Sequence, residues 1–138
     1  MLTRLNIRLF YDGRMISAYG DQAKFPEPVL RLKRWIERRF LHERNAIEPR
    51  VLVHLQGARE NKVSNSWINY HHHGYVMARV RNLLGLEKFV QVDNPTALGT
   101  ILIVTPYRAA FSAYRNAIKE MSPEHQARVS ARTIDSAQ

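Results

Sequence analysis

The chain has 138 residues, of which 45% are hydrophobic and 24% are charged. This composition argues against a disordered chain, and the length predicts one domain with a buried core. The chain has no cysteine, which excludes disulfide bonds, thiolate zinc sites and a cysteine nucleophile. Its 21 lysines and arginines outnumber its 12 aspartates and glutamates, giving a net charge of +9. This excess indicates an anionic partner, most often nucleic acid and next an acidic membrane surface, with simple solubility as the alternative.

No apolar run reaches the ~18–20 residues of a membrane helix, and residues 1–8 lack a signal-peptide stretch. We therefore expect an intracellular protein, in the nucleus or the cytoplasm, without a membrane partner. The lack of cysteine agrees with a reducing compartment.

The predicted elements alternate between short apolar runs and helical periods, which is typical of an α/β domain. Residues 7–11 predict a strand. Residues 28–41 carry apolar side chains at helical spacing, opposite a basic face with Arg31, Arg34 and Arg38.

The middle of the chain predicts a buried strand and a helix. Residues 51–55 are continuously apolar around His54, which suits a parallel strand buried on both faces and a structural histidine in the core. Asn69 is placed to cap the following helix and Gly85 to end it.

The strongest strand is expected at residues 100–105, with Thr105 capping the next helix and Pro106 at its first position. Ser122 begins a further short helix. Residues 128–134 then alternate in the manner of a strand near a sheet edge, and this places Arg128 on the polar side.

Right-handed crossovers between these elements build a mainly parallel sheet with helices on both faces. In such sheets functional residues gather beyond the carboxyl ends of the strands. Residues 56–69, 105–108 and 133–138 follow predicted strands and are unusually polar. We expect the site where these segments meet.

The sequence has no phosphate-binding loop and no dinucleotide fingerprint, and it assigns no catalytic residue. His71, His72 and His73 do not predict a metal site, because adjacent helical side chains point about 100° apart. The turn at residues 105–108 joins a hydroxyl, backbone N–H groups and a guanidinium at a helix start. It is either an anion site or a plain turn with a solvated arginine.

Four segments resemble superfamily 1 helicases, most closely the nonsense-mediated-decay helicase and its DNA and RNA relatives. Residues 103–108 (IVTPYR) resemble the family's TPYxxQ turn, and residues 129–138 (VSARTIDSAQ) its T-[VI]-D-S-x-Q motif. Residues 9–15 resemble its FYxGxL stretch. Residues 56–69 resemble its G…S-x-x-N-x-x-E helix entry. The segments follow the family's order and together cover most of the chain.

This resemblance implies that residues 1–138 are one partial, truncated second RecA-like domain, a three-layer α/β/α fold with a mainly parallel sheet. The chain departs from the family at Ala110, where the family has glutamine, and at His72, where it has glutamate. The phosphate loop, the arginine motif and the first motor domain are not in this sequence. We therefore expect no ATPase activity from the chain alone, and ATP and Mg²⁺ as cofactors only beside a separate first motor domain.

The resemblance also implies roles for individual residues. Ser66 and Asn69 would order the start of a helix, and Thr133, Asp135 and Gln138 match the motif that couples nucleotide state to the strand. The residues expected to line the nucleotide cleft are Thr105, Pro106, Tyr107, Arg108 and Gln138. The residues expected to bind nucleic acid are Arg31, Arg34, Arg38, Arg108, Ser66, Asn69, Thr133 and Asp135.

We expect a helicase-derived domain that binds single-stranded RNA or DNA weakly through a basic surface. One alternative is a protein-interaction module or homo-oligomer, in which a partner covers the edge left by truncation near residues 128–138. The other is half of an ATP-dependent helicase that acts with a separate first motor domain.

Overall fold

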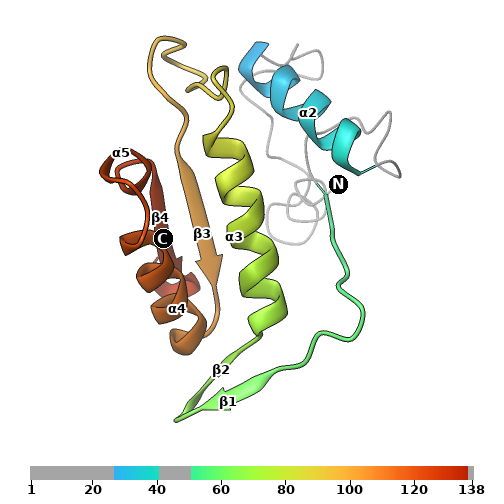
Figure 1. The fold of residues 1–138 in the computed structure, drawn as a ribbon, viewed down its shortest axis with the longest axis vertical. Helices are drawn as coiled ribbons and strands as arrows, with labels where there is room; N and C mark the ends of the chain where they lie inside the picture. Colours follow the sequence, from blue (N-terminus) through green and yellow to red (C-terminus); the bar gives the residue numbers. More distant parts are fainter. Residues whose placement is uncertain (1–26, 41–50, 137–138) are drawn as a thin grey trace, which may run out of the picture.

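The computed structural model describes residues 27–40 and 51–136 (Figure 1). The predicted strand at residues 7–11 and the resemblance at residues 9–15 lie outside them. In chain order the elements are α2 (Glu27–Arg39), β1 (Asn61–Val63), β2 (Ser66–Ile68), α3 (Tyr70–Leu84), β3 (Ile101–Thr105), α4 (Arg108–Lys119), α5 (Pro123–Gln126), β4 (Val129–Thr133) and the short 3-10 helix η2 (Ile134–Ser136).

The fold is mixed α/β, which confirms the predicted class and is compatible with a RecA-like domain. Strands β3 and β4 run parallel, in a register that pairs Ile101 with Val129 and Thr105 with Thr133. Strands β1 and β2 form an antiparallel hairpin, whose turn at Ser64 has a positive φ of 53°. The predicted succession of strand, helix and parallel strand is therefore present in β3, α4 and β4.

The hydrophobic core lies between α3, α4, β2 and the β3–β4 pair. Helix α4 covers one face of this pair, and its buried side chains recur at nearly one per turn, as an amphipathic helix requires. The buried core residues in this region are Ile68, Met77, Val80, Leu84, Ile103, Ala110, Tyr114, Ile118 and Val129.

Helices α2, α3 and α5 confirm the sequence predictions. The Asn69 side chain caps α3, Gly85 ends it, and the Ser122 hydroxyl accepts a hydrogen bond at the start of α5. Helix α2 lies beside the carboxyl-terminal end of α3 (Figure 1), where the Arg39 guanidinium donates to the Asn82 side-chain oxygen. No helix in residues 27–40 or 51–136 is long and apolar enough to cross a membrane.

Residues 51–55 do not form the predicted strand. The segment makes no ladder with any described strand; Leu52 is 88% exposed and His54 is also exposed, so neither belongs to the core. Val51, Val53 and Leu55 are half-buried. The segment therefore packs on its neighbours with one face only, and the prediction of a strand buried on both faces is wrong.

The hairpin of β1 and β2 was not predicted, since residues 56–69 were treated as polar loop. Two signals in the sequence could have identified it. Val63 and Trp67 are strand-forming residues, and the intervening Ser64 and Asn65 are common turn residues.

Two expectations about strand ends were also wrong. Helix α4 begins at Arg108 rather than Pro106, and Tyr107 precedes it with extended backbone and no side-chain cap. The Thr105 hydroxyl instead accepts a weak hydrogen bond from the Tyr107 N–H (3.4 Å) inside the turn. Arg128 is 8% exposed rather than solvent-facing, because its guanidinium donates to the carbonyl oxygens of Gly99 and Leu84.

Candidate functional site

The three polar segments predicted to meet do converge. Thr105 and Thr133 are register partners at the carboxyl ends of β3 and β4. The Ser66 hydroxyl in β2 accepts a hydrogen bond from the Ala109 N–H in the first turn of α4 (3.1 Å). Figure 1 shows β3 pointing toward the end of the molecule that holds the β1–β2 hairpin. We call this end of the molecule, formed by the β1–β2 hairpin, residues 105–108 and Thr133, the strand-end surface.

Ser66 and Asn69 each satisfy a backbone donor at the start of a helix. Asn69 accepts from the His72 N–H at 3.0 Å, as an N-cap residue does. The Ser66 hydroxyl accepts its hydrogen bond from the first turn of α4, 43 residues later in the sequence, and not from α3. The resemblance placed both residues at one helix entry, whereas the structure assigns them to two.

We expect Ser66→Ala and Asn69→Ala each to lower the free energy of unfolding by about 1 kcal/mol, the usual loss for a helix cap. Urea denaturation monitored by circular dichroism measures this. Ser112→Ala on the exposed face of α4 is the matched control. If Ser66→Ala unfolded at the same urea concentration as Ser112→Ala, the hydrogen bond to Ala109 would have no energetic role.

A pocket of about 480 Å³ opens beside the end of β3, and we call it the aromatic pocket. Thr105, Pro106 and Tyr107 line it, so these three cleft-lining predictions share one cavity. The other lining residues are Val51, Val53, Leu55, Glu60, Trp67, Ile68, Asn69, His72, His73, Tyr75, Val76, Val104, Ala110 and Tyr114. The aromatic side chains of Trp67, Tyr75 and Tyr114 were not predicted as lining residues, because they come from separate elements.

A histidine–tyrosine pair forms part of the pocket wall. The rings of His73 and Tyr114 lie 4.9 Å apart between centroids, in a tilted arrangement. The His73 Nε2 atom is buried and has no hydrogen-bond partner among the residues that the structure describes. Burial raises the pKa of the Tyr114 phenol above its ordinary value.

This pKa shift predicts a loss of stability in alkali. Above pH 10.0, the ordinary tyrosine value, the unfolded chain ionises at residue 114 while the folded chain keeps its proton. The unfolded state is then favoured, so the free energy of unfolding falls as pH rises. In Tyr114→Phe this contribution is absent. Urea denaturation between about pH 9 and 11 should show a steeper decline for the natural chain, and parallel declines would contradict the prediction.

Both departures from the helicase motifs lie in the aromatic pocket. Ala110, in place of the family glutamine, is on α4, and His72, in place of the family glutamate, is in the first turn of α3. A methyl group and an imidazole therefore stand where the family has a long amide and a carboxylate.

Arg108 belongs to the 105–108 turn but does not line the aromatic pocket. Its side chain is exposed and lines a second pocket of about 500 Å³, shared with the hairpin turn at Ser64 and Asn65. Asp135 is exposed in η2, directly after β4. Gln138 lies outside the described residues.

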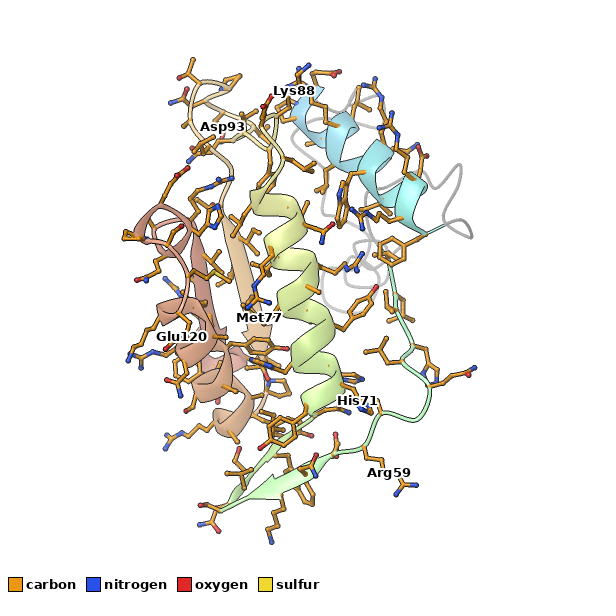
Figure 2. The ribbon with its side chains drawn as sticks, viewed as in Figure 1. Arg59, His71, Met77, Lys88, Asp93 and Glu120 are labelled. Carbon is orange, nitrogen blue, oxygen red and sulfur yellow. The ribbon has the colours of Figure 1, made fainter. Side chains whose placement is uncertain are left out.

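The predicted arginines of α2 lie far from the strand-end surface. Arg31, Arg34 and Arg38 line a third pocket, of about 660 Å³, with Leu83 in the last turn of α3 and residues 85–89 that follow the helix. Figure 2 shows Lys88 near this end and His71 near the other end of α3. The 15 residues of α3 span about 22 Å, so the predicted residues form two separate surfaces. Arg31 and Arg34 also share hydrogen bonds to Glu27 (3.1 and 3.3 Å).

Among residues 27–40 and 51–136, no group of three histidine, aspartate or glutamate side chains is arranged to hold a metal ion. His71 and His72 are exposed, and His73 is half-buried in the pocket wall.

The mixed α/β fold and its strand-end surface are compatible with a RecA-like domain. A family model described as an AAA domain matches residues 1–138. The match covers the whole chain, so the chain belongs to this family of helicase-like AAA domains, and the resemblance to helicases is confirmed at that level. The searches of curated proteins and of solved structures find no match.

Proposed function

We propose that the chain is a helicase-derived domain of the nonsense-mediated-decay type that binds single-stranded nucleic acid weakly at the strand-end surface. The observation that carries the proposal is the convergence of the 105–108 turn, Thr133 and the β1–β2 hairpin on one end of a parallel pair. Functional residues of parallel α/β sheets gather at such ends.

Charge supports an anionic ligand at this surface. Arg59, Lys62 and Arg108 are exposed in the hairpin region and the first turn of α4. The full chain carries a net charge of +9. Arginine and lysine bind the phosphate backbone independently of base sequence, and this binding weakens as salt rises. RNA and DNA strands are therefore both expected ligands.

Catalysis by the chain alone is not part of the proposal. The sequence holds no phosphate-binding loop, and phosphoryl transfer depends on such parts for positioning and charge stabilisation. ATP and Mg²⁺ would be bound only beside a separate first motor domain. The nucleus or the cytoplasm, where single strands occur, is the proposed location.

Arg108→Ala should weaken binding several-fold and reduce the slope of log affinity against log salt by about 0.7, the value for one phosphate contact on a single strand. Fluorescence anisotropy of a labelled strand measures both quantities. Arg115→Ala, an exposed arginine on the same helix, is the control and should retain the natural slope. Equal losses in the two variants would show that Arg108 acts only through net charge.

The separation of the two basic surfaces makes a second part of this experiment informative. A strand must be longer than the ~22 Å of α3 to reach both surfaces. Neutralising Arg31, Arg34 and Arg38 should therefore weaken binding of a strand of about 20 nucleotides but not of one of about three, which is too short to reach both. Equal weakening for both lengths would place the binding surface on α2 instead.

A protein-interaction role is the second candidate, and exposed apolar side chains on β3 favour it. Leu102 is 52% and Val104 is 48% exposed, on the face opposite the one that α4 covers. A second copy of the chain could cover this face. Sedimentation velocity over a wide concentration range tests this, with Leu102→Lys expected to abolish concentration-dependent association. A monomer at all concentrations would exclude it.

A further inference from the structure

We propose that the aromatic pocket receives a single nucleobase. If the base belongs to a strand, this inference rests on the proposed function. It then specifies that the base is the part of the strand that enters the aromatic pocket. A base could also come from a free nucleotide, and the experiment below separates these two sources.

The size and lining of the pocket suit a planar heteroaromatic ring. Its volume of about 480 Å³ lies within the ~300–1,000 Å³ of small-molecule sites. Trp67 is 40% and Tyr107 is 38% exposed, so both lining rings present part of their surface to an incoming group. Stacking of bases on aromatic side chains is the main sequence-tolerant attraction for single strands.

A buried polar atom in the wall lacks the partner that such a ring would supply. The His73 Nε2 atom is buried without a hydrogen bond to any residue within 27–40 or 51–136, while its imidazole packs on Tyr114. Buried polar atoms are nearly always paired, and a ligand group at the pocket wall would supply such a partner to the imidazole. The edge of a base carries both donors and acceptors, so it can pair with either tautomer of the imidazole.

The charged side chains around the pocket suit the base and the phosphate of a nucleotide at different places. Glu60 is the one carboxylate that lines the pocket in the part of the chain that the structure describes. Carboxylates accept hydrogen bonds from the exocyclic amines of bases. The neighbouring cations Arg59 and Lys62 are exposed outside the pocket lining. An uncharged ring can therefore enter while the phosphates stay near the cations.

The test compares a labelled single strand with the same strand carrying abasic sites, by fluorescence anisotropy at low salt. Ala110→Leu fills the pocket from α4. Ala113→Leu makes the same change one turn later, where the side chain lines the second pocket, and is the matched control. Circular dichroism and thermal unfolding verify that both variants fold. His73→Phe, which keeps a ring but removes Nε2, supplies an independent variant should Ala110→Leu not fold.

We expect the natural chain and Ala113→Leu to bind the abasic strand about ten-fold more weakly than the intact strand. We expect Ala110→Leu and His73→Phe to bind both strands with the same reduced affinity. If the natural chain bound intact and abasic strands equally, the pocket proposal would be overturned while the proposed function stood.

Calorimetric titration with AMP distinguishes the remaining cases. AMP binding that Ala110→Leu abolishes, without binding of any strand, would support the base pocket and overturn single-strand binding as the function. Failure to bind either AMP or a strand would overturn both. Strand binding that depends on the bases, without measurable AMP binding, would support a pocket that takes its base from a strand.

Discussion

Replacing Arg128 with methionine is expected to lower the free energy of unfolding by about 3 kcal/mol, since hydrogen bonds from charged groups contribute roughly 1.5–3 kcal/mol each. Arg128 is 8% exposed, and its guanidinium donates to the carbonyl oxygens of Gly99 (3.1 Å) and Leu84 (3.4 Å). The guanidinium carbon also lies 5.8 Å from the centre of the Phe89 ring. Methionine keeps much of the side-chain volume but leaves both carbonyls without this donor.

Urea denaturation of Arg128→Met beside Arg115→Met measures this effect. Arg115 is exposed and lies over an aromatic ring, Phe111, so its replacement changes charge and a similar ring contact without exposing a buried carbonyl. We expect less than 1 kcal/mol for this control, as for most surface substitutions. Similar losses in both variants would mean that the buried hydrogen bonds contribute nothing specific.

Tyr114→Ala is expected to lower the free energy of unfolding by about 3–5 kcal/mol, the usual range for deleting a buried aromatic side chain. Tyr114 is 7% exposed and belongs to the core cluster. Its deletion would extend the aromatic pocket into the core and remove the ring that packs on His73. Because domains of this size are stable by only ~5–15 kcal/mol, this loss is a large share of the free energy of unfolding.

Differential scanning calorimetry of Tyr114→Ala and Tyr114→Phe tests the prediction. The phenylalanine variant keeps the ring and the packing on His73, so its midpoint should lie close to that of the natural chain. A midpoint for the alanine variant within about 2 °C of the natural one would contradict the assigned core, since 1 kcal/mol shifts a domain of this size by several degrees.

Helix α3 and the β3–β4 pair could be predicted because their signals are local. Asn69 and Gly85 mark the two ends of α3, and the apolar run of β3 is bounded by Thr105. The parallel order also predicted polar segments beyond the carboxyl ends of these strands, and the register places Thr105 beside Thr133 there.

The errors arose where burial depends on distant parts of the chain. Arg128 alternates as a surface residue does, and only the carbonyls of Gly99 and Leu84 explain its burial. The apolar segment 51–55 gave no indication that one of its faces would stay exposed.

The candidate site was predictable in part for the same reason. The turn at residues 105–108 was identified from its own residues, whereas the aromatic pocket joins Trp67, His73 and Tyr114 from three elements. The distance between α2 and the strand-end surface depends on the tertiary fold. The sequence therefore predicted one nucleic-acid-binding set of residues, which the structure divides between two surfaces.

The most direct test of the central claim is the affinity of the natural chain for labelled single-stranded RNA and its DNA equivalent, by fluorescence anisotropy at about 50 and 200 mM salt. We predict micromolar binding that weakens roughly ten-fold over this range, as expected for two or three phosphate contacts on a single strand. Absence of binding to either strand at the lower salt concentration would contradict the account, and the net positive charge would then serve solubility alone.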